Sequence, residues 1–251
     1  MIRVLLVADT HLGQDEGRYL TFERALRPAL AGEVDLVVHG GDVFYRSRIK
    51  PGVVVRTFAP LKQIADRGVP VVVIPGNHER SAIPFPLMAM HPGIHIVGHP
   101  RTVVLKVRGD DVAIAGFPCE RDGIEGKFDA LVERTGWRDV RSHIRLLTFH
   151  QSVEGATVGP VGFTFRRHPD VIPGRAIPPG FAAVLAGHIH RHQVLTADLA
   201  GRRLAAPVFY PGSIERISSA EANETKGSVT MNIEANAHGG RVASWTFHET
   251  T

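Results

Sequence analysis

The stretch VDLVVHGGD at residues 34–42 sets the expected fold of this chain. A nearly unbroken apolar, β-branched run ends there in two glycines and an aspartate. Such a run is typical of a strand buried on both faces that stops at a tight turn. Two similar runs lie on either side of it, RVLLVA at residues 3–8 and VPVVVIP at residues 69–75. The pattern predicts three neighbouring buried strands.

Helical patterns connect these three runs. Apolar residues recur at helical spacing in the first connection at Phe22, Leu26, Ala29 and Leu30, and in the second at Val54, Phe58, Leu61 and Ile64. Strands alternating with helices in this way predict βαβ units around a parallel sheet, and therefore an α/β fold. Pro28 and Pro60 fall inside the two helical patterns, so we expect the helices to be kinked or shortened there.

Short strands dominate the expected structure from residue 94 onward. The strand-like runs cover residues 94–98, 102–109, 111–117, 143–150, 192–199, 202–212, 226–235 and 240–249, with a helix near 127–136 and a hairpin turn at 236–240. The segment 151–180 is rich in glycine and proline and has no convincing period, which indicates a long functional loop. Because no stretch has a linker-like composition, residues 1–251 are predicted to form a single domain.

The overall composition excludes few classes of protein. The chain has 251 residues, 43% of them hydrophobic and 22% charged, which is ordinary for a globular protein. A formal net charge of +4 is compatible with a polyanionic partner but does not identify one. Cys119 is the only cysteine, which favours a cytoplasmic location. No apolar stretch approaches the roughly 18 residues of a membrane span, so no membrane association is expected.

Five strand-like runs end in Asp, Asn or His. The residues at these ends are Asp9 and His11, Asp42, Asn77 and His78, His150, and His188 and His190. Each of them alone is better explained as a turn, cap or strand-end residue than as a functional one. The same placement repeated after five strands favours a common site, because ligands bind at the carboxyl ends of strands in open α/β sheets.

The residue types in this set indicate metal binding. They offer oxygen and nitrogen donors with no nearby thiolate, which favours Mn, Fe, Zn, Ni or Co over Ca or Mg. Two such cations about 3.5–4 Å apart lower the pKa of a shared water and clamp phosphoryl oxygens for in-line displacement. Asp42, on its Gly-Gly turn, has two carboxylate oxygens with which to bridge a pair of cations.

The ordered set from Asp9 to His190 resembles the calcineurin-like metallophosphoesterase superfamily. Flanking sequence at residues 40–44, 170–193, 210–218 and 226–234 resembles the SbcD-type DNA-repair exonucleases within it. The resemblance implies a two-sheet αββα sandwich and a hydrolase that cleaves phosphodiesters through a water activated by two metals.

The resemblance also assigns roles to the site residues. One metal, most simply Mn²⁺, would be held by Asp9, His11, Asp42 and His190, and the other by Asp42, Asn77, His150 and His188. His78 would not be a ligand but would act on the phosphate with Asp42, stabilising charge or protonating the leaving oxygen. DNA is the implied substrate, with an SMC-like ATPase partner and a homodimer through the first helices as further expectations.

Three features depart from the nuclease pattern. Tyr45 stands where the family usually has a histidine, and a phenol can hydrogen-bond a phosphate but is not a cation at neutral pH. This disfavours the processing of DNA ends more than phosphodiester cleavage itself. Glu79 replaces the usual aspartate. The chain also ends at Thr251, before the DNA-gripping cap and the ATPase tether. A partner that docks differently, a protein that works alone and a shortened chain all fit this last observation.

Candidate substrate contacts lie in loops that follow the metal-binding motifs. They are Tyr45, Arg46, Arg48, Arg80, Arg166 and Arg167. A solvated surface accounts equally well for part of this set. Phe163 and Phe165 beside the last two arginines are expected to anchor the loop to the core, with stacking on an unpaired base as the alternative.

The sequence therefore predicts a metal-dependent phosphodiesterase, with a DNA-repair-type nuclease as the preferred function. A phosphodiesterase for cyclic nucleotides or nucleotide-sugar lipids on the same fold is the alternative. A metal-binding scaffold without catalysis is a third possibility, which the complete ligand set and the presence of His78 argue against.

Overall fold

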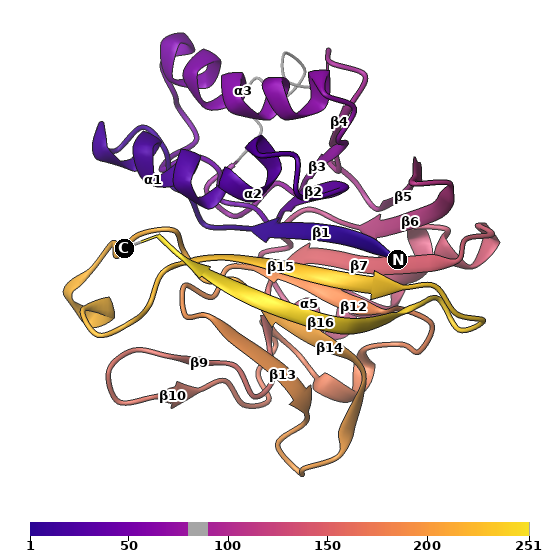
Figure 1. Ribbon diagram of the computed structural model, residues 1–251. Helices are drawn as coiled ribbons and strands as arrows, with labels where there is room; N and C mark the ends of the chain where they lie inside the picture. Colours follow the sequence, from indigo (N-terminus) through magenta and orange to yellow (C-terminus); the bar gives the residue numbers. More distant parts are fainter. Residues whose placement is uncertain (80–89, 251) are drawn as a thin grey trace.

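Two six-stranded sheets form the centre of the computed structural model, which describes residues 1–79 and 90–250 (Figure 1). The first sheet consists, in spatial order, of β16 (Arg241–Glu249), β15 (Gly227–Glu234), β1 (Ile2–Val7), β2 (Leu36–His39), β3 (Val71–Val73) and β4 (Ile94–Ile96). The second consists of β13 (Gln193–Ala197), β14 (Arg203–Tyr210), β12 (Ala183–Gly187), β7 (Ile144–His150), β6 (Asp110–Gly116) and β5 (Arg101–Val107).

The central strands of both sheets run parallel. In the first sheet β1, β2, β3 and β4 are parallel, and β15 and β16 add antiparallel strands at one edge. In the second sheet β6, β7, β12 and β14 are parallel, with β5 and β13 antiparallel at the two edges. The loops that follow β1, β2 and β3 therefore leave the first sheet at the same end, the carboxyl end of its parallel strands.

Alternation of side chains along β1 builds the layers. Ile2, Val4 and Leu6 point into the core between the sheets, while Leu5 and Val7 pack under the helices. The helices α1 (Gly17–Ala25), α2 (Arg27–Leu30) and α3 (Pro51–Asp66) cover the outer face of the first sheet (Figure 1). On the other side, α5 (Ile124–Arg134) covers the second sheet. The predicted two-sheet αββα sandwich is confirmed.

The two prolines inside the predicted helices act differently. The first helical pattern is divided at Leu26 into α1 and α2, and Pro28 lies in the first turn of α2, where no N–H is needed. In contrast, α3 continues through Pro60. Burial of Leu61 and Ile64 beneath α3 stabilises the helix beyond that residue. No helix within residues 1–79 and 90–250 has the length and apolar character needed to cross a membrane.

The segment 151–180 contains more regular structure than its sequence indicated. Strand β8 (Ser152–Val153) pairs in parallel with β11 (Val171–Ile172), and β9 (Thr157–Val158) forms an antiparallel hairpin with β10 (Phe163–Thr164). Strands of two residues are too short to show a period. We call residues 155–168, which contain the hairpin, the β9–β10 arm; Figure 1 shows it extending from the body of the molecule.

Candidate metal centre

Four of the predicted site residues adopt a backbone conformation that residues other than glycine rarely take. The φ angles are +52° at Asp9, +45° at His11, +51° at Asp42 and +89° at His188. In the part of the chain that the structure describes, Arg108 is the only other non-glycine residue with a positive φ. Such conformations cost about 1 kcal/mol or more each and are concentrated at functional sites. The strained loops thus coincide with the residues that the sequence selected.

Two glycines let these loops approach each other closely. A Cβ atom at Gly76 would lie 2.2 Å from Oδ1 of Asp42, and one at Gly187 would lie 2.2 Å from the carbonyl oxygen of Gly40. Neither space admits a side chain. The loops after β2, β3 and β12 therefore meet at one point only because glycine occupies both positions.

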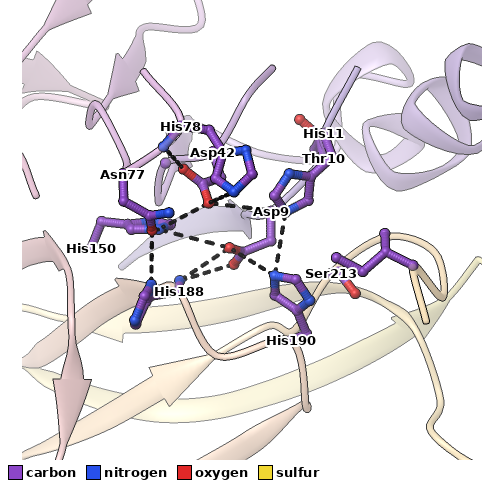
Figure 2. A network of polar contacts seen from close by, with 12 residues as sticks. Asp9, Thr10, His11, Asp42, Asn77, His78, His150, His188, His190 and Ser213 are labelled. Carbon is purple, nitrogen blue, oxygen red and sulfur yellow. Dashed lines mark hydrogen bonds and ion pairs between the residues drawn. The ribbon is translucent and has the colours of Figure 1, made fainter. Parts of the chain in front are cut away.

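One half of the site gathers Asp9, His11 and His190 (Figure 2). Nε2 of His11 lies 3.3 Å from Nε2 of His190, which in turn lies 3.6 Å from Oδ1 of Asp9. Ligand atoms of the three residues all lie within 4.8 Å of one another. Two imidazole nitrogens and a carboxylate that face one another in this way form a pocket of donors suited to a cation.

The other half gathers Asp42, Asn77, His150 and His188. Nε2 of His150 lies 3.1 Å from Oδ1 of Asn77 and 3.3 Å from Oδ2 of Asp42. Nδ1 of His188 lies 3.0 Å from the same Asn77 oxygen. The Nδ1–H of His150 donates to the carbonyl of Gly40 at 2.8 Å, so that Nε2 is the nitrogen that faces the cluster.

The electrostatics of the site favour bound cations. Burial lowers the pKa of His11 and of His188 to about 3, which keeps both imidazoles neutral and their lone pairs available. Burial also acts to lower the pKa of His150, but the carboxylates of Asp42 and Asp9 outweigh it and raise the pKa to about 9. The two buried carboxylates and the neutral imidazoles of His11 and His188 thus form an electron-rich cluster that fits a pair of divalent ions.

His78 and Tyr45 border this cluster on its exposed side. The Nδ1–H of His78 donates to the carbonyl of Tyr45 at 2.6 Å, and its Nε2 lies 3.8 Å from Oδ2 of Asp42. The imidazole therefore turns its second nitrogen toward the site while remaining partly exposed. Tyr45 is 39% exposed, and the centroid of its ring lies 6.4 Å from that of His78. Both side chains are placed to contact a molecule that enters the site.

The arginines predicted to contact substrate are less uniform. Arg46 and Arg48 are exposed on the loop between β2 and α3, and Arg166 is exposed on the β9–β10 arm. Arg167 pairs with Glu125 of α5 at 3.0 Å, on the helix that covers the second sheet. Arg80 lies outside the described residues.

Glu221, which the sequence did not reveal, supports one of the histidines. Its carboxylate accepts a hydrogen bond from Nδ1 of His190 at 3.1 Å and pairs at 2.7 Å with Lys226, which is fully buried. Burial acts to lower the pKa of His190, but the bond to Glu221 and the charge of Asp9 outweigh it and raise the pKa. A carboxylate behind an imidazole fixes its tautomer and increases its basicity as a ligand.

Replacing Glu221 with Ala is expected to weaken Mn²⁺ binding at this half of the site by about 10- to 100-fold. Glu221→Gln, which keeps an acceptor but removes the charge, is expected to give a smaller loss. Isothermal titration of chelator-treated protein measures both affinities. Glu133→Ala, on the exposed surface of α5, is the matched control. Unchanged binding in a folded Glu221→Ala variant would contradict a supporting role.

Glu79 joins the loops of two strands from beneath the site. Its carboxylate accepts backbone N–H groups of Asp42 at 2.9 Å, Phe44 at 2.8 Å and Gly76 at 2.7 Å. Burial, together with the charge of Asp42, raises its pKa to about 8. A glutamate here thus positions the loops after β2 and β3 relative to each other, a role that the sequence did not indicate.

Glu79→Gln is expected to lower the free energy of unfolding by about 1–3 kcal/mol. In the wild-type chain both carboxylate oxygens accept backbone N–H groups, whereas in the variant the amide N–H₂ would face one of these donors and leave it without an acceptor. Urea unfolding followed by circular dichroism measures the change. Glu154, which accepts the N–H of Gly174 away from the site, provides a control in Glu154→Gln. Equal losses in both variants would argue against a special role for Glu79.

The fold and this cluster together define a class of protein, the metal-dependent phosphoesterases. The chain belongs to the calcineurin-like phosphoesterase family, whose model matches residues 2–192. This match confirms the predicted superfamily, and it confirms the predicted enzyme class, a phosphoesterase. Members of this class use divalent metal ions, and the groups described above could hold them.

Similar proteins include the DNA double-strand break repair protein Mre11 of Thermoplasma acidophilum, which is 25% identical over 86% of this chain and 57% of its own length. Mre11 of Saccharolobus solfataricus is 26% identical over 79% of this chain and 52% of its own. The chain thus spans about half the length of these relatives. The crystal structure of TT1561 of Thermus thermophilus aligns with a TM-score of 0.56 at 16% identity, covering 85% of this chain and 90% of that one, and so shares the fold.

Proposed function

We propose that this chain is a nuclease that hydrolyses phosphodiester bonds of DNA with two divalent metal ions, Mn²⁺ in the first place. The observation that carries the proposal is the convergence of seven predicted ligands from five separate strand ends. Two bound cations would make water nucleophilic near neutral pH and offset the charge of the phosphate. The similarity to Mre11 proteins, whose name states a role in DNA repair, supports DNA as the substrate.

We assign the roles of the side chains from their positions. Asp9, His11 and His190 hold one ion, Asn77, His150 and His188 hold the other, and Asp42 lies between the halves and serves both. His78 turns Nε2 toward the site and donates a proton to the leaving oxygen. The phenol of Tyr45 hydrogen-bonds a phosphate oxygen, and Arg46 and Arg48 contact flanking phosphates.

The experiment that tests this function compares two substrates. Chelator-stripped protein reloaded with Mn²⁺ is given end-labelled linear DNA and, separately, bis-p-nitrophenyl phosphate. Degradation of both, lost on removal of the metal, is the expected result. Turnover of the aryl diester alone would rule out DNA as the substrate and favour a phosphodiesterase for small molecules. Tyr45 in place of a histidine would then be one reason for the failure to cleave DNA. Turnover of neither would favour a binding scaffold.

Two further predictions concern the organisation of the chain. We infer that residues 1–251 form one domain, because Ile2 and Val4 of the first sheet share a core with Ile114 and Leu146 of the second. We further propose a homodimer through the first helices and an SMC-like ATPase partner.

A further inference from the structure

Hydrogen bonds from Gln193 and Arg191 hold the root of the β9–β10 arm in place. The side chain of Gln193 accepts the N–H of Thr157 at 2.8 Å and donates to its carbonyl at 2.9 Å. The guanidinium of Arg191 donates to Oγ1 of Thr157 at 3.2 Å and to the carbonyl of Gly159. Because Arg191 directly follows His190, the root of the arm is attached to the segment that carries a candidate metal ligand.

The two phenylalanines of the arm differ in exposure. Phe165 is partly buried against the outer core of the second sheet, and its N–H donates to the carbonyl of Ala156 at 2.8 Å. Phe163 is 59% exposed and meets Phe165 edge to face at 5.4 Å, and Val161 at the tip is 91% exposed. The predicted anchoring therefore applies to Phe165, while Phe163 leaves its ring open to a partner.

A basic side chain and a polar cavity belong to the same arm as Phe163. Arg166 lies next to the ring pair in sequence and forms no ion pair with any residue of 1–79 or 90–250. A polar cavity of about 340 Å³ is lined by Pro160 of the arm, by Arg191 and His192, and by residues 219–220 and 222–225; Arg191 pairs there with Glu224 at 2.9 Å. The size of the cavity is that of a small-ligand site. An exposed aromatic ring with an arginine three residues further along the same arm suits a polyanion that carries flat apolar faces.

We infer that the β9–β10 arm binds an unpaired stretch of the DNA strand, with one base stacked on Phe163 and a phosphate near Arg166. This inference rests on the proposed nuclease function and names the form of DNA that the site receives. Bases inside a duplex already stack on their neighbours, whereas an unpaired base offers its face to an aromatic side chain. Single-stranded or frayed DNA is therefore the preferred substrate.

Binding is tested directly with a fluorescent ring in place of Phe163. In metal-stripped Phe163→Trp protein, a thymidine oligonucleotide is expected to quench the added tryptophan emission, with wild type giving the background of Trp137 and Trp245. Leu199→Trp, on the turn between β13 and β14 where Leu199 is 45% exposed, is the matched control. Equal responses at both positions would overturn stacking on the arm.

Cleavage then separates this inference from the function on which it rests. Phe163→Ala is expected to lower cleavage of single-stranded DNA about tenfold, while cleavage of blunt duplex and of bis-p-nitrophenyl phosphate is unchanged. Leu199→Ala should leave all three rates intact. If Phe163→Ala cleaved single-stranded DNA at the wild-type rate, the inference would fail while the nuclease function would stand. The same conclusion would follow if the variant changed from dimer to monomer and kept its cleavage rate, because Phe163 would then serve the dimer interface. A wild-type protein that cleaves only the aryl diester would overturn the nuclease function as well.

Discussion

Asp42→Asn is expected to reduce hydrolysis of both DNA and bis-p-nitrophenyl phosphate by roughly 1,000-fold or more. Oδ2 of Asp42 lies 3.3 Å from Nε2 of His150 and 4.0 Å from Nε2 of His11, so this one carboxylate faces both halves of the site. Asparagine has almost the same shape but carries no charge and replaces one oxygen with a donor. The variant therefore loses the group that serves both ions.

The loss must be separated from a folding defect, because Oδ1 of Asp42 also accepts the N–H of His78 at 2.9 Å. Circular dichroism and thermal unfolding of the metal-free variant check the fold, and metal analysis counts the ions retained. Asp129→Asn on the exposed face of α5 controls for the change of charge. A folded Asp42→Asn protein with activity within tenfold of wild type would contradict a bridging role.

His78→Asn is expected to lower kcat for DNA by about 100- to 10,000-fold, the range found when a general acid is removed. The loss for bis-p-nitrophenyl phosphate should be much smaller, since nitrophenolate leaves without needing a proton. Bound metal should not change, because His78 donates its Nδ1–H to Tyr45 and approaches the cluster from the exposed side. The different response of the two substrates identifies proton donation.

Steady-state kinetics with both substrates and a metal assay provide the comparison. His143→Asn, on an exposed histidine outside the site loops, is the control. If both substrates slowed by the same factor, His78 would act by stabilising charge on the phosphate. If the variant bound less metal than the wild type, His78 would be a metal ligand.

Most of the architecture could be predicted because it depends on local patterns. Buried strands such as β2 (Leu36–His39) show β-branched runs in the sequence, and the polar residues that follow them mark the end of the sheet where parallel strands deliver side chains. The division of the first helix followed from Pro28, whose fixed φ and missing N–H suit only the first turn of a helix. The break expected at Pro60 does not occur, because the packing of α3 against the sheet outweighs the tendency of proline to interrupt a helix.

The supporting residues could not be predicted because their partners lie far along the chain. Glu221 is 31 residues beyond His190 and follows no periodic pattern. His39, which ends an apolar run, is buried and accepts the N–H of Gly41, with Nε2 3.1 Å from Oγ1 of Thr10. Phe163 is exposed whereas Phe165 is partly buried, and nothing in the sequence around the two phenylalanines predicts this difference. Such roles follow from tertiary contacts alone.

A titration of Mn²⁺ into chelator-stripped protein, with bound metal and hydrolysis of bis-p-nitrophenyl phosphate measured in the same samples, tests the central claim most directly. A dinuclear phosphodiesterase built from these side chains should bind two ions per chain, and hydrolysis should rise with the second. Full activity at one bound ion per chain, or saturation with two ions and no hydrolysis of any phosphodiester, would contradict it.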